Sequence, residues 1–285
     1  MNRRGIALLA TLWLVTALSV VAAGALMLAR IQRGTAIDRV ALLRGRVAAE
    51  GCLAVLEGTL AAGGPIADTD SIDLGGGLWC RARIEDLGTR VSVEITNAEP
   101  LARLIGDNER TAALMDWVDP DDLPRDGGAE REWYAARGLR VPRNAPLGDV
   151  AELHHIRGFD STTIARLTPF LTKWSSTRVD VNTAPREVLE TLPGFEPAVV
   201  DYILGRRARG EKAGDLDGLL AALPTSLRAA AMARYADLRA RVTFAPERVV
   251  VRLEGGVPEV PFLVRSTVLG LVADRRLAIL AREDW

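Results

Sequence analysis

The chain has 285 residues, of which 48% are hydrophobic, and it carries 36 basic and 37 acidic residues. This length allows one or two domains with sizeable cores. The balanced charge gives no general attraction to nucleic acid, because such binding depends on an excess of lysine and arginine. The two cysteines are too few for a disulfide scaffold.

The N-terminal region contains an uninterrupted apolar segment. No charged residue occurs from Gly5 to Ala29. A helix needs about 20 apolar residues to cross a bilayer core of about 30 Å, whereas a cleaved secretory signal has a shorter apolar region of about 7–15 residues. The segment therefore predicts a transmembrane helix. Basic residues flank it on both sides, so the positive-inside rule alone leaves the orientation open, and the short basic leader favours a cytoplasmic N-terminus.

The residues Arg4-Gly5-Ile6-Ala7-Leu8-Leu9 resemble the prepilin peptidase site of type IV pilins and pseudopilins, where a short basic leader ends in glycine before a long apolar helix. The resemblance implies cleavage after Gly5 and N-methylation of Ile6. Most such proteins carry glutamate five residues into the mature chain, but this sequence has Ala10 there. An unpaired carboxylate in hydrocarbon is costly, so a subunit without a partner for it gains by losing the charge. The alternative is an ordinary signal anchor.

The helical pattern continues beyond the apolar segment until Gly63-Gly64-Pro65 ends it. The prediction is one helix of about 55 residues, roughly 80 Å long at 1.5 Å per residue. Only part of it fits in lipid, so the remainder must pack on a soluble domain. A break near Gly34 or Gly45 would instead give two helices. The apolar residues of the continuing pattern are Ile37, Val40, Ala41, Leu43, Val47, Ala48, Leu53, Leu56 and Leu60.

Alternating apolar and polar residues predict strands in two separate parts of the chain. The first part is 78–95, and the second lies within 241–281, with a hairpin turn at Ala273-Asp274-Arg275. The ~140 residues between them read as helices with short loops. The fold class is therefore α+β, a long N-terminal helix plus a small antiparallel sheet with a large inserted all-α domain. The predicted parts are a leader at 1–5, a transmembrane helix at 6–29, its periplasmic continuation at 30–62, a pilin-like domain at 63–97 and 240–285, and an insertion at 98–239.

Two segments of the insertion, 149–171 and 183–207, resemble helix-hairpin-helix units. In DNA-binding units a Gly-x-Gly hairpin offers backbone N–H groups to a phosphate. The second glycine is replaced here by Asp160 in one unit and by Glu196 in the other, and a carboxylate repels phosphate. No nucleic-acid partner is therefore predicted. The alternative function, a membrane-tethered DNA-binding or uptake protein, would rest on the basic residues Arg206, Arg207, Arg209 and Lys212.

Acidic residues are concentrated on a turn at 116–130. Such hard oxygen ligands suit Ca²⁺, which takes six to eight oxygens in flexible geometry. The spacing departs from an EF-hand, because Leu123 and Pro124 stand where a ligand and the turn glycine are needed. The alternative is a Pro-constrained surface turn whose acids only cap helices.

The segment Asp-Trp-x-Asp-x-Asp-Asp followed by Gly-Gly-Ala-Glu, together with the prepilin site and Ala10, resembles the K-type minor pseudopilins of bacterial type II secretion. This family is described with bound calcium and with an all-α domain inside a pilin-like α/β domain. By that resemblance the candidate calcium ligands are Asp119, Asp121, Asp122 and Glu130.

Cys52 lies on the predicted long helix and Cys80 near the start of the first strand region. A periplasmic location permits a disulfide between them. The alternative is one packed thiol in each element.

No nucleophile elbow, P-loop or His-Glu-x-x-His zinc signature occurs, so no enzyme is predicted. The resemblance implies a minor pseudopilin that caps the tip of the periplasmic pseudopilus used in protein export. It implies a single pass through the inner membrane, with the N-terminus in the cytoplasm and the bulk in the periplasm. The expected partners are the I- and J-type minor pseudopilins, the major pseudopilin and the prepilin peptidase.

Overall fold

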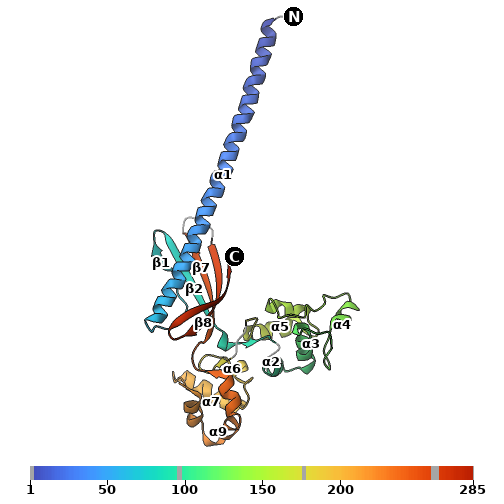
Figure 1. Cartoon of the computed structure of the whole chain (residues 1–285), viewed down its shortest axis with the longest axis vertical. Helices are drawn as coiled ribbons and strands as arrows, with labels where there is room; N and C mark the ends of the chain where they lie inside the picture. The colour runs from blue at the N-terminus through green and yellow to red at the C-terminus, as the bar shows by residue number, and fades with distance from the viewer. Residues whose placement is uncertain (1–2, 95–97, 175–177, 258–262, 285) are drawn as a thin grey trace. The chain divides into compact units, whose positions relative to one another are not determined.

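The computed structural model describes residues 3–94, 98–174, 178–257 and 263–284. They form a long N-terminal helix, a five-stranded sheet and a helical region (Figure 1). The chain divides into a helix–sheet unit, residues 1–84, 251–268 and 281–285, and a helical unit, residues 85–250 and 269–280. The predicted α+β class with a long helix, an antiparallel sheet and a helical domain is confirmed. The predicted domain boundaries stay predictions.

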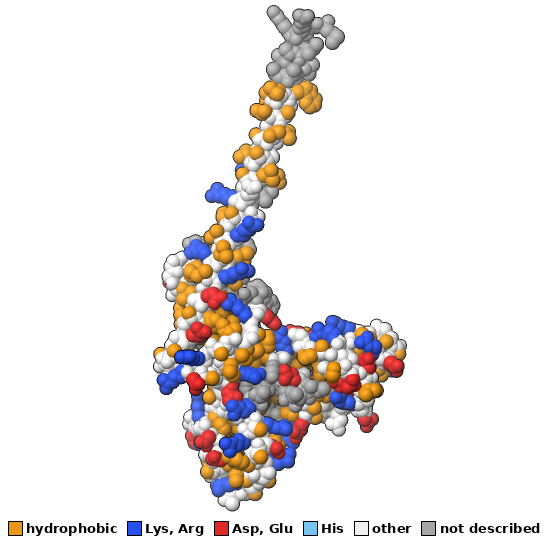
Figure 2. Space-filling view, viewed as in Figure 1, with side chains coloured by type: hydrophobic (Ala, Val, Ile, Leu, Met, Phe, Trp, Pro, Cys, Tyr) orange, Lys and Arg blue, Asp and Glu red, His pale blue; other side chains and the backbone are white. Residues whose placement is uncertain are grey.

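Helix α1 runs without interruption over Arg3–Ala61, so the break considered at Gly34 or Gly45 does not occur. Gly63 follows the end of the helix in a left-handed conformation, with φ of 83°, and donates its N–H to the Leu60 carbonyl at 2.9 Å. By length and composition α1 can cross a membrane, since an 18-residue window within it has a mean hydropathy of 2.2. In Figure 2 hydrophobic side chains cover this part of α1, and blue lysine and arginine side chains follow where the apolar stretch ends.

The C-terminal half of α1 has two different apolar faces. One face is buried in the helix–sheet unit and consists of Ala41, Ala48, Ala49, Cys52, Leu53, Leu56 and Leu60. Four residues predicted to share that face are half or more exposed: Ile37, Val40, Leu43 and Val47. The expectation of one apolar stripe packed on the head was therefore wrong for these four. They form an exposed apolar stripe on the opposite side of the helix.

The sheet has the strand order β1-β2-β7-β8-β9. β1 and β2 are antiparallel, with Ile72 opposite Cys80, and β8 and β9 are joined by the predicted hairpin turn. Asp274 and Arg275 adopt φ of 49° and 61° there, the left-handed conformation that two-residue hairpin turns require. The strands are β1 Ile72–Gly75, β2 Leu78–Asp86, β7 Arg248–Gly256, β8 Leu263–Ala273 and β9 Arg276–Asp284.

Small residues let α1 approach the sheet closely. A Cβ added at Gly45 would lie 2.7 Å from Val264 Cγ2, and one added at Gly255 would lie 2.7 Å from the Ala49 nitrogen. Both glycines are therefore needed for contact between the helix and β7 or β8.

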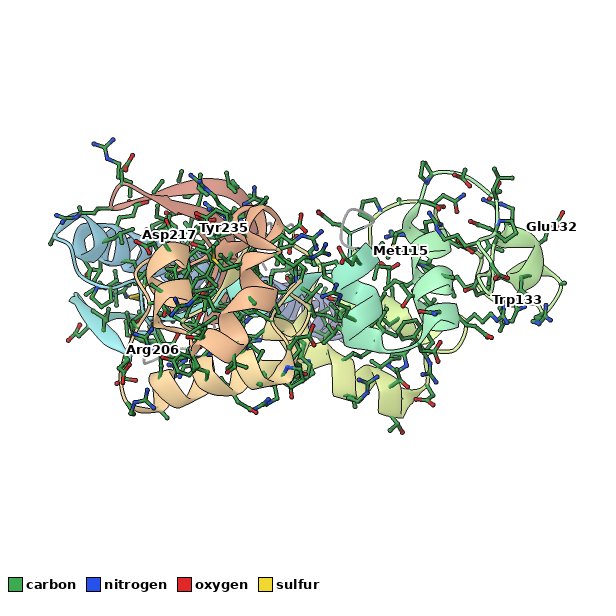
Figure 3. The ribbon with its side chains drawn as sticks, turned by 90° about the horizontal axis from the view of Figure 1, so that it is seen from below. Met115, Glu132, Trp133, Arg206, Asp217 and Tyr235 are labelled. Carbon is green, nitrogen blue, oxygen red and sulfur yellow. A yellow bond between two sulfur atoms is a disulfide. The ribbon has the colours of Figure 1, made fainter. Side chains whose placement is uncertain are left out.

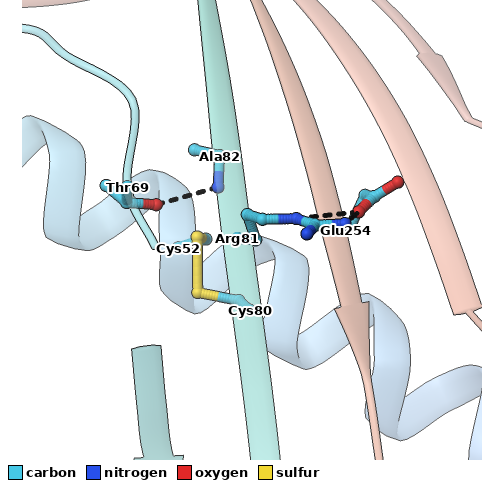
Figure 4. The surroundings of a disulfide bond; sticks show 6 residues. All are labelled: Cys52, Thr69, Cys80, Arg81, Ala82 and Glu254. Carbon is cyan, nitrogen blue, oxygen red and sulfur yellow. Dashed lines mark hydrogen bonds and ion pairs between the residues drawn. A yellow bond between two sulfur atoms is a disulfide. The ribbon is translucent and has the colours of Figure 1, made fainter. Parts of the chain in front are cut away.

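A disulfide joins α1 to β2. Cys52 and Cys80 are fully buried, and their Cα atoms are 5.8 Å apart (Figure 4). The bond closes a segment with a sequence separation of 28. A loop of this length lowers the entropy of the unfolded chain by an amount worth about 3–4 kcal/mol of stability.

The helical unit has its own core, built from residues between Val91 and Val242. The helices are α2 Ala98–Ile105, α3 Asn108–Val118, α4 Arg131–Ala135, α5 Ser161–Leu167, α6 Arg186–Leu189, α7 Pro197–Ala208, α8 Leu216–Ala222, α9 Thr225–Met232 and α10 Tyr235–Arg241, with 3-10 turns at Leu87–Thr89, Val150–His155 and Thr168–Phe170. Two short parallel strand pairs join them, so the unit is not purely α-helical. They are β3 Val91–Ser92 with β4 Leu171–Thr172, and β5 Val179–Asp180 with β6 Val242–Thr243.

The prediction of strands over 78–95 is confirmed for β2 and β3, but the expectation that the second half joins the sheet was wrong, and Ile95 lies outside the described residues. β2 ends at Asp86, whose carboxylate accepts a hydrogen bond from the Gly88 N–H at 2.9 Å and begins a 3-10 turn. Val91 and Val93 then enter the core of the helical unit instead of the sheet. This segment pairs with β4 and not with a strand of the sheet. The local sequence does not reveal which strand it pairs with.

Candidate metal site in the acidic loop

The acidic loop connects α3 to α4. Asp107 caps α3 by accepting a hydrogen bond from the Arg110 N–H at 3.0 Å, and the last turn of the helix is buried. Glu130 occupies the N-cap position of α4, but its side chain makes no capping hydrogen bond. In Figure 3 Met115 marks α3 and Trp133 marks α4, the two elements that hold the ends of the loop.

Three carboxylates converge between these helices. Asp116, Asp119 and Glu130 are 0%, 2% and 4% exposed, and one oxygen of each lies within 4.8 Å of the others. Asp116 and Asp119 stand three residues apart at the end of α3, which places them on one side of the helix. Buried carboxylates this close together repel each other unless a cation or a proton compensates their charge.

The hydrogen bonding of the cluster is incomplete. Asp119 Oδ1 and both carboxylate oxygens of Glu130 are buried and have no hydrogen-bond partner among the residues that the structure describes. Burial, and then the charges of Asp116, Asp119 and Asp122, raise the pKa of Glu130 to about 7. Unpaired buried oxygens of this kind are the donor set that a hard divalent cation prefers.

Arg125 partly compensates the charge of the cluster. Its Nη1 donates to Asp116 Oδ1 at 2.7 Å and also to Asp119 Oδ2. Its backbone N–H donates to the Asp116 carboxylate at 3.2 Å. Gly128 lies against the same carboxylate, and a Cβ there would overlap it. The loop is therefore folded around Asp116, with one cationic side chain reaching in from the surface.

The structure brings two of the four predicted ligands into the cluster. Asp119 and Glu130 lie in it, whereas Asp121 and Asp122 are exposed. Asp121 Oδ1 accepts from the Leu123 N–H at 2.9 Å, and Asp122 Oδ1 accepts from Asn144 Nδ2 at 3.0 Å. These hydrogen bonds shape the turn and do not cap a helix.

Sequence reasoning missed Asp116, although its spacing of three from Asp119 on a helix was a usable signal. Arg125 was also missed, because nothing in the local sequence shows that the loop folds back onto α3.

Aromatic side chains fix the helices beside the cluster. Trp117 and Tyr134 are fully buried and meet edge to face, with ring centroids 5.2 Å apart. The Tyr134 hydroxyl accepts a hydrogen bond from the Arg157 N–H at 3.0 Å, and Arg157 Nη1 donates to the Gly128 carbonyl at 2.8 Å. The end of α3, the loop and the start of α4 are thus held together by packing that does not involve the carboxylates.

The other residues singled out in the sequence lie elsewhere. Gly5, Ile6 and Ala10 belong to the first turns of α1, where the structure describes the backbone and not these side chains. Their roles stay predictions.

The basic residues that would support DNA binding are largely engaged within the chain. Arg206 and Arg209 both pair with Glu211, at 2.9 and 2.7 Å, and Arg207 donates to the Ala184 carbonyl. Glu196, the carboxylate at the hairpin of the second unit, makes no capping hydrogen bond with α7. The basic cluster is therefore a locally neutralised helix end.

Comparisons with known proteins point to one family. Residues 96–176, which contain the whole acidic loop, match the family model described as type II secretion system (T2SS), protein K. Type II secretion system protein K of Klebsiella pneumoniae is 35% identical over 118 residues, which are 40% of this chain and 35% of that protein. The protein of the same name from Pectobacterium carotovorum subsp. carotovorum is 36% identical over 96 residues, 33% of this chain and 27% of that protein. The aligned part is about a third of the length of these curated relatives.

The fold was compared with solved structures as well. The chain is similar to one in the crystal structure of the GspK-GspI-GspJ complex from the enterotoxigenic Escherichia coli type 2 secretion system, with a TM-score of 0.67. The match covers 89% of this chain and 99% of that chain at 17% sequence identity, which shows a common fold. Family model, curated relatives and fold agree, and the predicted resemblance to the K-type pseudopilin family of type II secretion is confirmed.

Proposed function

We propose that this chain is a minor pseudopilin of a type II secretion system, anchored in the inner membrane by α1 with its head in the periplasm. The observation that carries the proposal is a protein K family segment in a chain that begins with one uninterrupted 59-residue helix. Such a helix is long enough to cross a bilayer and to continue into a soluble head. The buried disulfide between α1 and β2 supports an oxidising compartment for the head.

The proposed route into the membrane includes processing by the prepilin peptidase. Cleavage after Gly5 and methylation of Ile6 would leave a mature chain that begins at the apolar helix. The motif at these residues supports this step. Ala10, in place of the usual glutamate, leaves the mature helix without a carboxylate in the apolar region.

The proposed partners are the I- and J-type minor pseudopilins and the major pseudopilin. The similar solved structure is a complex named for GspK, GspI and GspJ. The exposed apolar stripe of Ile37, Val40, Leu43 and Val47 supports helix–helix association, because these side chains repeat at spacings of three and four along α1. Burying them against sister helices would remove their apolar surface from water.

Two features of the chain support a proposed position at the tip of the pseudopilus. Ala10 offers no carboxylate to the N-terminal amine of a neighbouring subunit. The helical unit, residues 85–250 and 269–280, is a large addition to a pilin-like scaffold, which suits a subunit that need not repeat along a regular lattice. Both features suit a subunit that ends a filament.

We also propose that the acidic loop binds Ca²⁺. The supporting observations are the convergence of Asp116, Asp119 and Glu130 and the unpartnered buried oxygens of the last two. Three carboxylates can supply up to six of the six to eight oxygens that calcium takes. The bound ion would compensate their charge and tie the end of α3 to the start of α4. The role is structural, in keeping with an assembly subunit rather than an enzyme.

The function is tested by deleting the gene for this chain in its host and measuring export of a secreted protein into the medium. We expect export to be lost in the deletion strain and restored when the wild-type chain is supplied. Val40→Asp, on the exposed apolar stripe, should reduce co-purification with the I- and J-type subunits. Leu139→Asp, at a leucine of the helical unit that is 50% exposed, is the matched control and should not. Undiminished export without the chain would contradict the proposal.

A further inference from the structure

The chain carries its own cation at the site proposed for calcium, and the inference below rests on that proposal. Arg125 Nη1 contacts oxygens of both Asp116 and Asp119. Their side chains are 0% and 3% exposed, whereas that of Arg125 is 41% exposed. The positive charge therefore enters a buried acidic cluster from the solvent side.

The guanidinium uses oxygens that a metal ion would need. Calcium binds carboxylate oxygens at 2.3–2.6 Å, and Nη1 lies 2.7 Å from Asp116 Oδ1. Two cations on the same oxygen repel each other strongly in a partly desolvated site. Calcium and the guanidinium are thus alternatives at Asp116 and Asp119.

The compensation by Arg125 is incomplete. The oxygens of Glu130 have no hydrogen-bond partner among the described residues, and neither does Asp119 Oδ1. A single guanidinium therefore leaves part of the acidic cluster without a counterion. A divalent ion that reached all three carboxylates would satisfy more of these oxygens than the arginine does.

The side chain of Arg125 can leave without unfolding the loop. Its backbone N–H donates separately to the Asp116 carboxylate at 3.2 Å, and its carbonyl accepts from the Gly128 N–H at 2.8 Å. The turn is held by these main-chain bonds. The exposed guanidinium needs only to rotate into water, which solvates it readily.

We propose that Arg125 is a tethered competitor of calcium: its guanidinium neutralises Asp116 and Asp119 in the metal-free protein and must swing into solvent before the ion binds. The arginine then sets the calcium concentration at which the loop fills. It also neutralises part of the charge of the metal-free cluster, which makes the unfilled subunit more stable before it meets the ion.

The competition predicts opposite effects on affinity and on metal-free stability. Arg125→Gln should bind calcium on the order of 10-fold more tightly, the size expected from losing charge-assisted hydrogen bonds at a partly exposed site. The same variant should unfold at a lower temperature without calcium, because the cluster loses its counterion. The difference in melting temperature should shrink or reverse at saturating calcium.

The experiment titrates calcium chloride into the full-length chain in detergent by isothermal calorimetry, after removal of metal with a chelator, and records melting temperatures with and without calcium. Arg131→Gln is the matched control. Arg131 approaches Asp122 at 3.6 Å on the exposed rim, so its loss removes the same charge without freeing the cluster. Its calcium affinity should change by less than about 3-fold, as for a surface ion pair.

Each outcome decides between the two proposals. Tighter binding by Arg125→Gln alone supports the competition, even if the wild-type chain binds too weakly to measure. Equal or weaker binding by Arg125→Gln, when the wild-type chain binds, overturns the competition and leaves the calcium site in place. An equal gain in calcium affinity in Arg131→Gln also overturns the competition, since the loss of one positive charge near the site would then explain the effect. Absence of binding in all three proteins overturns both proposals.

Discussion

The effect of Glu130 on the free energy of unfolding should depend on pH and on calcium. Burial raises the pKa of this carboxyl from 4.5 to about 7 in the folded chain. The folded protein therefore holds a proton on Glu130 that the unfolded chain has already lost between these two values. Stability must fall as pH rises through this window, because the folded state binds more protons there. Each unit of pKa shift corresponds to about 1.36 kcal/mol, so the full loss is about 3 kcal/mol.

The variant Glu130→Gln removes the titration while keeping the shape of the side chain. Relative to the wild-type chain, its free energy of unfolding without calcium should increase by about 3 kcal/mol between pH 4.5 and pH 8. The comparison across pH cancels any constant cost of the substitution. With saturating calcium at pH 8 the order should reverse, because the variant has lost one of the proposed carboxylate ligands.

The assay is urea unfolding of the full chain in detergent, followed by tryptophan fluorescence, to which the fully buried Trp117 beside the cluster contributes as one of six tryptophans. Each protein is measured at pH 4.5, 6 and 8 with a chelator, and at pH 8 with calcium. A difference between the two proteins that stays constant over this range would show that the pKa of Glu130 is not raised by folding.

Three further outcomes are expected. Gly45→Ala should destabilise the chain by about 1–3 kcal/mol, because the added Cβ would overlap the sheet. Gly34→Ala is the control and should not destabilise the chain, since an added Cβ there meets nothing within 4 Å. Equal effects of the two variants would contradict the close packing of α1 on the sheet. Replacing both cysteines by serine should cost about 3–4 kcal/mol, read from the urea midpoint, and a change below about 1 kcal/mol would count against the disulfide. Burial, and then the charge of Asp180, raise the pKa of Asp86 to about 6, so stability should fall between pH 3.8 and 6, and Asp180→Asn should make that fall shallower in thermal unfolding at stepped pH.

The elements that sequence predicted well are those whose periodicity is long. α1 was predicted as one helix because a helical pattern without a break extends from the apolar segment to Gly63. β7, β8 and β9 each span nine or more residues rich in β-branched and other apolar side chains, and the turn at Asp274 and Arg275 joins β8 to β9. Local pattern and tertiary environment agree in these elements.

The predictions that failed involve choices between partners far apart in the chain. An alternating segment such as Val91–Ser92 can join any available strand, and here it pairs with β4 in the helical unit. An apolar helix face can meet the molecule's own sheet or a sister subunit, so Val40 and Val47 could not be assigned from periodicity alone. Both cases are decided by tertiary geometry.

The acidic loop shows the same limit at the level of single residues. Its composition and family resemblance pointed to Asp119 and Glu130, which do converge. The turn directs Asp121 toward its own backbone instead, and the fold of the loop over Asp116 adds a carboxylate and an arginine that spacing did not indicate. A ligand set depends on which oxygens are buried, and burial follows from the packing of α3 against α4.

Processing of the chain as a pseudopilin would leave a defined N-terminus that mass spectrometry can read. The full-length gene is expressed in a host with an active prepilin peptidase, and the purified protein is examined by intact-mass and peptide mass spectrometry. We expect a chain that begins at Ile6 and carries one added methyl group. A protein that retains Met1 through Gly5 in that host would contradict it.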